Sequence, residues 1–264
     1  MSSNTTGATR FPPGTFTPAP KRASAVRMLA AQGKVESFLF LRHGEQQLLN
    51  LFIPLVGLIA LARFDLVPGV GDNPLAMTFP FIMAVASMSS GFTGQAISLA
   101  FDRRYGALKR TGASGVPAWT IVFGKVIAVL AVTVVQIIIL GTTALILGWT
   151  ATITGTLLGI FTLLIGVAAF TSLGLLMGGT LSSEMVLALA NLVWVIMTGI
   201  AGWAVFSPEV NADGALSIVP SVALAQGMVN AFAGEIPWMQ LGILSVWLLV
   251  AGFAANRWFS FTAK

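Results

Sequence analysis

The chain contains no cysteine, one histidine and only 9% charged residues, and each shortage excludes a class of site. Without cysteine it can form no disulfide, no thiolate nucleophile and no cysteine-based metal site. The histidine, His43, has no second histidine and no acid-rich cluster near it in the sequence, which argues against a metal or catalytic role. No G-x-x-x-x-G-K-[ST] phosphate loop occurs, so this chain cannot bind ATP through that motif. We therefore expect no catalytic residue, metal or cofactor in this chain.

Apolar residues make up 56% of the sequence, and its mean hydropathy is +0.89. These values are too high for a typical soluble domain, and a helix needs about 20 apolar residues to cross a bilayer. The apolar stretches lie at Gln46–Ala62, Phe79–Ala100, Ala118–Leu147, Gly155–Met177, Met185–Phe206 and Trp238–Asn256. The first stretch is short and carries Asn50 and Pro54. The pattern predicts an all-α membrane protein with six transmembrane helices.

Positive charge is confined almost entirely to one side of these spans. Of the 14 Lys and Arg residues, only Arg63 lies in a connection on the other side. The others precede the first span, lie between the second and third spans (Lys125 is counted there), or follow the sixth span. The positive-inside rule then predicts a multi-pass protein of the cell membrane with both termini in the cytoplasm. The net charge of +5 beside the spans indicates contact with anionic lipid and a cytoplasmic partner, not with nucleic acid.

The connecting segments divide the chain further. Residues 1–23 are rich in Ser, Thr, Pro and Gly, which predicts a disordered cytoplasmic tail before a single transmembrane domain at 24–264. Residues 24–42 have apolar side chains at helical spacing and predict an amphipathic helix at the membrane interface. The outer connection 207–237 has an apolar centre at Leu216–Ala233 with Pro220 at a helix start. This centre is too short to span, and we expect a re-entrant or interfacial helical hairpin before the last span.

Polar and small residues recur inside two spans. In the second span they follow α-helical spacing, which predicts one face: Ser87, Ser90, Gly91, Gly94, Gln95 and Ser98. This face could line a translocation path or pack against another helix; we favour packing for the glycines and lining for Gln95. A stripe in the fourth span, containing Gly155, Gly159 and Gly166, favours packing. Asn191 and Gln136 are either interhelical hydrogen-bonding residues or substrate contacts.

The most specific segment lies between the second and third spans and reads FDRRYGALKRTGA, residues 101–113. By charge alone it could be a basic cytoplasmic loop. The order of its residues resembles the coupling-helix segment of the ABC type-2 exporter permeases: an acidic residue, arginines and a glycine before a Leu-Lys-Arg stretch and a Gly/Ala turn. Asp102 departs mildly from the family pattern, since many members carry Glu there.

The resemblance extends over nearly the whole chain. The helix 24–42 looks like the family's cytoplasmic connecting helix, and the six spans, the outer half-helices around Pro220 and the terminal Arg257-Trp258-Phe259 match in order. Within this family, the chain resembles the actinobacterial subfamily of drug and lipid exporters in particular. The resemblance implies one membrane subunit of an ATP-driven exporter. Two such subunits, identical or homologous, would join two copies of a separate ABC ATPase subunit that binds ATP and Mg.

This resemblance also assigns roles to residues. The ATPase-coupling residues would be Asp102, Arg103, Arg104, Tyr105, Leu108, Lys109 and Arg110. The candidate substrate path combines the polar residues of the second span with one residue of the fifth: Ser87, Ser90, Gln95, Ser98 and Asn191. No charged residue is expected deep in a span, which favours a hydrophobic or amphipathic substrate such as a drug, lipid or glycolipid.

Two other classes of function remain open. A secondary transporter driven by an ion gradient would normally need a midplane carboxylate or a pair of interrupted helices. An intramembrane enzyme would need paired acids, an H-E-x-x-H motif or a Ser–His pair within the spans. Neither pattern is visible in the sequence. An ATPase with a phosphate loop encoded beside this chain would distinguish the exporter from both.

Overall fold

The computed structural model describes residues 23–42, 44–64, 73–113, 115–207, 209–212 and 214–258, and every regular element in these ranges is a helix. The predicted tail 1–23 lies outside the described residues except for Ala23. The α-helices are α1 (Ala25–Arg42), α2 (Gly44–Arg63), α3 (Leu75–Met88), α4 (Gln95–Arg104), α5 (Ala107–Ala113), α6 (Ala118–Ile146), α7 (Ile153–Thr180), α8 (Ser183–Phe206), α9 (Pro220–Phe232) and α10 (Trp238–Trp258). The predicted all-α class is confirmed.

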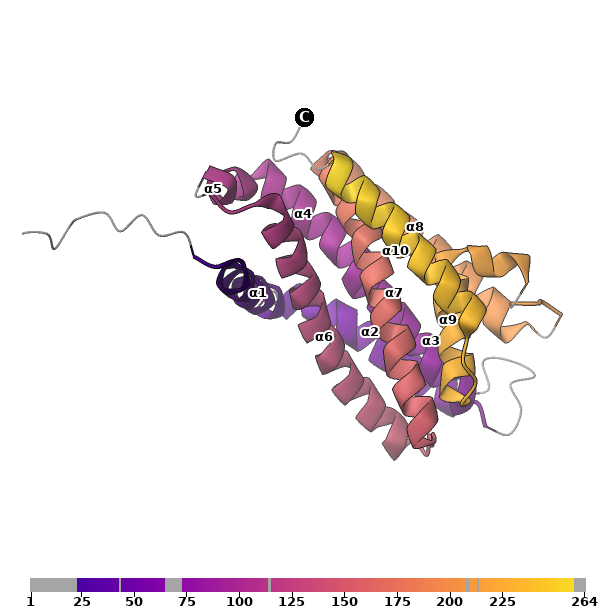
Figure 1. Ribbon diagram of the computed structural model, residues 1–264. Helices are drawn as coiled ribbons and strands as arrows, with labels where there is room; N and C mark the ends of the chain where they lie inside the picture. The colour runs from indigo at the N-terminus through magenta and orange to yellow at the C-terminus, as the bar shows by residue number, and fades with distance from the viewer. Residues whose placement is uncertain are drawn as a thin grey trace, which may run out of the picture.

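Helices occupy all six predicted spans. In the described residues, five of them are long and apolar enough to cross a membrane: Leu75–Arg104, Trp119–Ile146, Ile153–Thr180, Ser183–Phe206 and Trp238–Trp258. The predicted first span corresponds to α2, which contains Pro54 and a shorter apolar stretch, Asn50–Arg63. The long helices run side by side, with α5 at one end of the bundle and α9 toward the other (Figure 1). The chain is therefore a multi-pass membrane protein.

The N-terminal helix α1 lies against the flank of α6 (Figure 1). Glycines allow the two helices to approach closely. A Cβ atom on Gly33 would lie 2.8 Å from Cδ1 of Ile127, and one on Gly124 would lie 2.7 Å from Cγ of Gln32. Phe38 remains 58% exposed, as expected for a helix whose apolar side faces an interface. The predicted helix at 24–42 is thus present, and it is fixed to the bundle through α6.

The second span contains a feature that was not predicted. A π-helix, η1 (Ser89–Gly94), joins α3 to α4. Because its hydrogen bonds run from i to i+5, its turn is wider than that of an α-helix. The residues that follow therefore point in directions different from those that uninterrupted α-helical spacing predicts. Gly91 lies against Phe170 of α7, whereas the Ser98 hydroxyl accepts a hydrogen bond from Lys125 of α6 at 3.2 Å. The prediction of one uninterrupted α-helical face through this span is therefore corrected.

Helix α7 forms the centre of the packing, and its glycines lie against three neighbouring segments: α9, η1 and α4. A Cβ on Gly155 would lie 2.5 Å from the carbonyl oxygen of Phe232, and one on Gly166 would lie 2.3 Å from Leu224 Cδ1, both on α9. Farther along α7, a Cβ on Gly178 would lie 2.4 Å from the carbonyl oxygen of Ala96 on α4. The packing role predicted for the glycines of the fourth span is confirmed.

Replacing Gly174 by Ala tests this packing. Its Cβ would lie 2.5 Å from the carbonyl oxygen of Phe92 and 2.8 Å from that of Gly91, and backbone atoms cannot rotate away. We expect Gly174→Ala to lower the free energy of unfolding by about 1–3 kcal/mol, as overpacking does elsewhere. Gly141→Ala on α6 is the matched control, because nothing lies within 4 Å of its added Cβ. Thermal unfolding in detergent measures both; equal stability of the two variants would contradict the close contact.

The outer connection is simpler than predicted. Pro220 begins α9, as expected, and α9 has 13 residues, too few to cross the membrane. Among the described residues of this connection, a 3-10 turn, η2 (Ala215–Ile218), precedes it in place of a second half-helix. The indole nitrogen of Trp247 on α10 donates to the Ile218 carbonyl oxygen at 2.9 Å. In place of the predicted hairpin, the described residues form a short turn and one helix. That helix, α9, contacts α3, α7, α8 and α10 and is largely buried among them.

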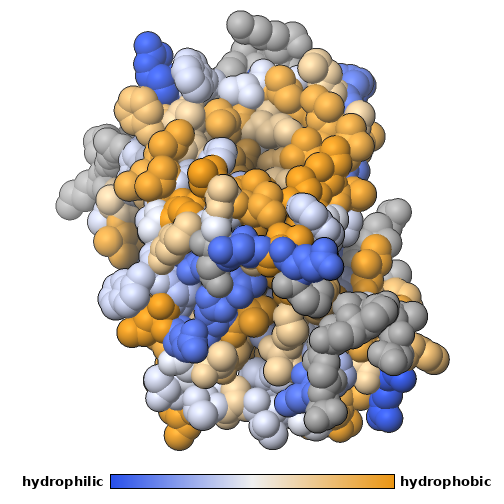
Figure 2. All heavy atoms as spheres, turned by 90° about the vertical axis from the view of Figure 1, so that its right-hand side faces the viewer, coloured by the Kyte–Doolittle hydropathy of each residue, from blue (hydrophilic) through white to orange (hydrophobic). Residues whose placement is uncertain are grey.

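Much of the outer surface of the bundle is apolar. Figure 2 looks onto the right-hand side of Figure 1 and shows broad apolar areas, with hydrophilic side chains across the middle of the view and near its upper and lower edges. On α8, large side chains point outward, including Leu187 at 48%, Leu192 at 55% and Val195 at 57% exposure. A soluble protein would not leave such a surface in water, whereas lipid or a partner subunit can cover it. The surface agrees with a membrane-embedded fold.

Candidate functional site

The segment 101–113, which resembles a coupling helix in sequence, is divided in two. Asp102, Arg103 and Arg104 belong to the last turn of α4, and a turn at Tyr105–Gly106 separates them from α5. Gly106 has φ +70°, a conformation that glycine adopts at little cost. The expected single helix is therefore corrected to a helix end, a sharp turn and a seven-residue helix.

Helix α5 has one side buried and one side exposed. Leu108 is only 3% exposed and packs with Leu99, Ile121 and Leu175, which fixes α5 to the bundle. Tyr105 is 67% exposed, and Lys109 and Arg110 are exposed as well. We call the exposed residues Tyr105, Lys109 and Arg110 the α5 surface. It offers two positive charges and an aromatic ring to a partner.

The two arginines at the end of α4 bind other helices. Arg103 is 4% exposed, and its Nη1 donates to the carbonyl oxygens of Gly178 at 2.8 Å and Leu181 at 3.0 Å. These carbonyls lie at the C-terminal end of α7, where orphan acceptors and the helix dipole favour a cation. Arg104 forms an ion pair of 2.5 Å with Glu184 on α8. Glu184 thus pairs with a cation, while Ser182 accepts from the Met185 amide as the N-cap.

A buried lysine joins three helices, α1, α4 and α6, at the same end of the bundle. Lys125 of α6 is 1% exposed, and its Nζ lies 2.7 Å from Oδ2 of Asp102 on α4 and 3.2 Å from Oε2 of Glu36 on α1. It also donates to the Ser98 hydroxyl at 3.2 Å. We call Lys125, Asp102, Glu36 and Ser98 the Lys125 cluster. Together with the arginines it fastens the end of α4 to α1, α6, α7 and α8.

Sequence reasoning missed this cluster. Lys125 was counted among the cytoplasmic charges, but it lies inside the span Trp119–Ile146, and Glu36 was not singled out. The assignment of Lys125 to the connecting segment is therefore corrected: it lies within the span, near the α5 end and not at the centre. The available signal was the position of Lys125 within an apolar run, because an ionisable residue there needs a partner. The sequence could not show that Glu36 and Asp102 are the partners of Lys125, because they lie 89 and 23 residues away from it.

The candidate path residues do not form one group. Ser87, Ser90 and Gln95 are each at most 1% exposed inside the bundle, and Ser98 belongs to the Lys125 cluster. Asn191 lies on the exposed face of α8, where its amide donates to the Leu187 carbonyl oxygen of its own helix at 3.1 Å. Their contact with a substrate stays a prediction.

Two mid-span glutamines show opposite environments. The Gln136 amide donates to the carbonyl oxygens of Ala86 at 3.2 Å and Asn50 at 3.4 Å, which confirms it as an interhelical hydrogen-bonding residue. Gln95 is 1% exposed, and in the described part of the chain neither its Nε2 nor its Oε1 has a hydrogen-bond partner. A buried amide without partners costs about 1–3 kcal/mol, so Gln95 is costly to the fold.

Comparison with known protein families supports this arrangement. Residues 67–261, well over half of the chain, match the family model described as ABC-2 family transporter protein. The matched region includes α3, η1, α4, α5, α6 and every later helix, whereas α1 and α2 precede it. No curated protein matches the chain.

Proposed function

We propose that this chain, which belongs to the ABC-2 transporter family, is the transmembrane subunit of an ATP-driven exporter. The family consists of membrane transport components, not catalytic domains, and membership implies an ABC ATPase partner in general. In our proposal two permease subunits, identical or homologous, join two copies of that ATPase, which binds ATP and Mg. The cargo is a hydrophobic or amphipathic compound, a drug, lipid or glycolipid, taken from the cytoplasm or the inner leaflet of the cell membrane.

The observation that carries the proposal is the way in which the α5 surface is attached. Lys109 and Arg110 are exposed, while the adjoining end of α4 is bound through Arg103, Arg104 and Asp102 to three other helices, α7, α8 and α6. A partner that moves α5 would therefore move the ends of several spans together. Such a connection lets the nucleotide state of the ATPase favour one of two arrangements of the permease.

The decisive experiment is co-expression with an ABC ATPase encoded beside the chain. We expect the two proteins to purify together, and the reconstituted complex to hydrolyse ATP faster when its substrate is present. Transport driven by an ion gradient in vesicles without ATP would instead favour a secondary transporter and overturn the proposal.

The substrate path is proposed to run between two permease subunits. The apolar core between the spans of one bundle is filled by side chains such as Phe79 and Phe170, whereas an interface between subunits can provide a drug-sized path across the membrane. The exposed face of α8 supports this location, because it carries Asn191 in the middle of an apolar span. An amide facing lipid is unfavourable, and a second subunit or a polar group of the substrate could satisfy it.

Gln95 provides a test of function against packing. We expect Gln95→Leu to leave the thermal stability unchanged or raised, because it removes an amide without partners, and to lower substrate-stimulated ATPase activity more than basal activity. Gln136→Leu is the matched control and should lower stability, since its amide bonds two helices. Loss of stability and of both activities together in Gln95→Leu would identify it as a packing residue.

The predicted orientation can be tested because the chain has no native thiol. Ala113 at the end of α5 and Glu235 between α9 and α10 are both exposed. In whole cells, we expect a membrane-impermeant maleimide to label Glu235→Cys but to label Ala113→Cys only after the cells are opened. The reverse result would show that α5 faces outward and would contradict a cytoplasmic ATPase partner.

A further inference from the structure

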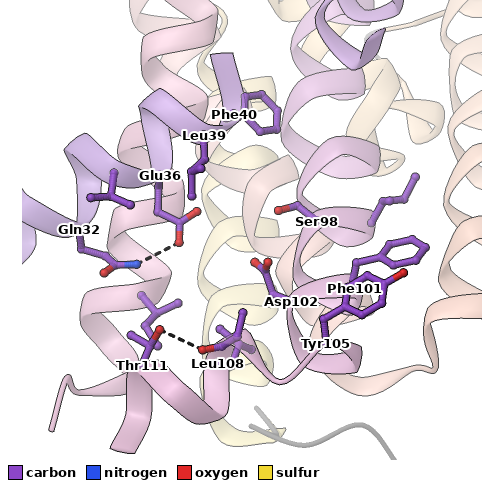
Figure 3. Close-up of a pocket in the computed structure, with 14 residues that line it drawn as sticks. Gln32, Glu36, Leu39, Phe40, Ser98, Phe101, Asp102, Tyr105, Leu108 and Thr111 are labelled. Carbon is purple, nitrogen blue, oxygen red and sulfur yellow. Dashed lines mark hydrogen bonds between the residues drawn. The ribbon is translucent and has the colours of Figure 1, made fainter. Parts of the chain in front are cut away.

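A cavity of about 560 Å³ lies between α1, α4, α5 and the start of α6, next to the Lys125 cluster. Its volume is within the range of roughly 300–1,000 Å³ that small-molecule sites occupy. Figure 3 shows Glu36 on α1 and Asp102 on α4 pointing into this space, with Ser98 beside them. The cavity is thus formed by helices that are distant in sequence.

The cavity has an excess of negative charge. Two carboxylates share the ammonium group of Lys125, so the three groups carry one uncompensated negative charge. Among the lining residues that the structure describes, none is a lysine or an arginine. The side chains of Glu36 and Asp102 remain 16% and 35% exposed, and both line the cavity. Lys125 meets Oδ2 of Asp102, and in the described part of the chain no hydrogen bond reaches Oδ1.

The other walls are mainly apolar and aromatic. Phe101 and Tyr105 stack with ring centroids 5.9 Å apart on one side, and Phe40 closes the other. Val35 and Leu39 of α1 line the cavity and are also 53% and 52% exposed to the outside. Aromatic faces attract cations, and apolar walls accept a hydrocarbon chain. A hydrated metal ion or a small inorganic cation would leave these walls without a partner.

We propose that this cavity binds an amphipathic amine, with its ammonium group between Asp102 and Glu36 and its hydrocarbon chain along Val35, Leu39 and Phe101. The ammonium neutralises the remaining carboxylate charge and hydrogen-bonds Oδ1 of Asp102. The exposed apolar residues of α1 form the entrance, so the ligand enters from the lipid leaflet on the α5 side of the bundle. The site follows from the geometry of one chain and does not depend on the ATPase partner.

The test uses protection of a single cysteine in the full chain, reconstituted in phosphatidylcholine nanodiscs. Thr111→Cys places a thiol in the cavity wall, and Ala113→Cys places one on the exposed side of α5 as the matched control. The neutral reagent methyl methanethiosulfonate modifies each thiol, and intact-mass spectrometry follows the rate. The probes are dodecylamine and dodecanol, which share the chain but differ in charge.

We expect dodecylamine to slow the modification of Thr111→Cys about tenfold more than dodecanol does, a difference equivalent to roughly 1.4 kcal/mol. Ala113→Cys should show no difference between the two probes. Adding Asp102→Asn, or independently Glu36→Gln, should remove the preference for the amine; size-exclusion chromatography confirms that each variant is folded. Equal slowing by both probes, equal protection of Ala113→Cys, or a preference that persists in both carboxylate variants would overturn the proposal. Because no ATPase is present, failure here would leave the exporter assignment intact.

Discussion

Reversing the charges of Lys109 and Arg110 together is expected to abolish ATP-driven transport while leaving the membrane bundle folded. Both side chains are exposed on α5, and the structure shows no ion pair between either of them and another described residue. Two glutamates at these positions would repel the surface of the proposed ATPase, which is expected to complement the native positive charges. Charge reversal at an interface costs several kcal/mol, so affinity should fall by roughly two orders of magnitude or more.

The measurement is co-purification of the ATPase, followed by substrate-stimulated ATP hydrolysis in liposomes. The matched control reverses Arg27 and Lys34, two exposed cations of α1 that are not among the residues lining the cavity between α1 and α5. It changes the net charge by the same amount and should leave coupling intact. Wild-type assembly and transport in the Lys109→Glu, Arg110→Glu variant would show that α5 is not the coupling element.

Arg103 and Arg104 are unsuitable for the same test, although they share the sequence motif. Arg103 is buried against the carbonyl end of α7, and Arg104 is paired with Glu184. A glutamate at Arg103 would place a negative charge against carbonyl oxygens and the negative end of a helix dipole. Loss of transport in that variant would therefore report a damaged fold as well as any loss of ATPase contact.

The second large effect is expected for Lys125→Met. The change leaves the carboxylates of Glu36 and Asp102 without their shared cation, and breaking a buried ion pair in this way costs about 3–5 kcal/mol. Since both carboxylates are partly exposed, we expect the lower value, about 3 kcal/mol of unfolding free energy. Thermal unfolding in detergent measures the loss.

A triple variant supplies the control for this prediction. Adding Glu36→Gln and Asp102→Asn to Lys125→Met removes the two unpaired charges and should restore most of the stability, because a neutral cluster of similar volume requires no cation. If Lys125→Met is as stable as the native chain, the ion pairs do not hold α1, α4 and α6 together. If the triple variant is no more stable than Lys125→Met, packing of the lysine stem is the larger contribution.

The elements with a strong local signal were predicted from the sequence. A bilayer demands long apolar helices, so the spans could be located by composition, and helix α1 followed from apolar side chains at helical spacing. The start of α9 at Pro220 was also predicted, because proline is favoured in the first turn of a helix. The glycines of α7 pointed to close packing, although not to the contacts with α9 and the end of α4 that make it necessary.

Other features depended on how distant segments meet. The π-helix at Ser89–Gly94 has no local signature, and it places Ser98 beside Lys125. Charge placement alone assigned Lys125 to a loop, and exposure of Arg103 was implied by its place in a basic motif. Both side chains are buried, because the acceptors that stabilise them come from helices far away in the sequence.

The membrane class, the helix positions and the ABC-2 family motif can be recognised in the sequence, since each arises from composition or from residues close together in the chain. The folded arrangement of the helices sets which charges are available to a partner and which hold the helices together. It also brought Glu36 and Asp102 to the same cavity from α1 and α4. The physical reason is that a buried charge is stable only beside opposite charges and hydrogen-bond partners, and the packing of α1, α4, α6, α7 and α8 supplies them.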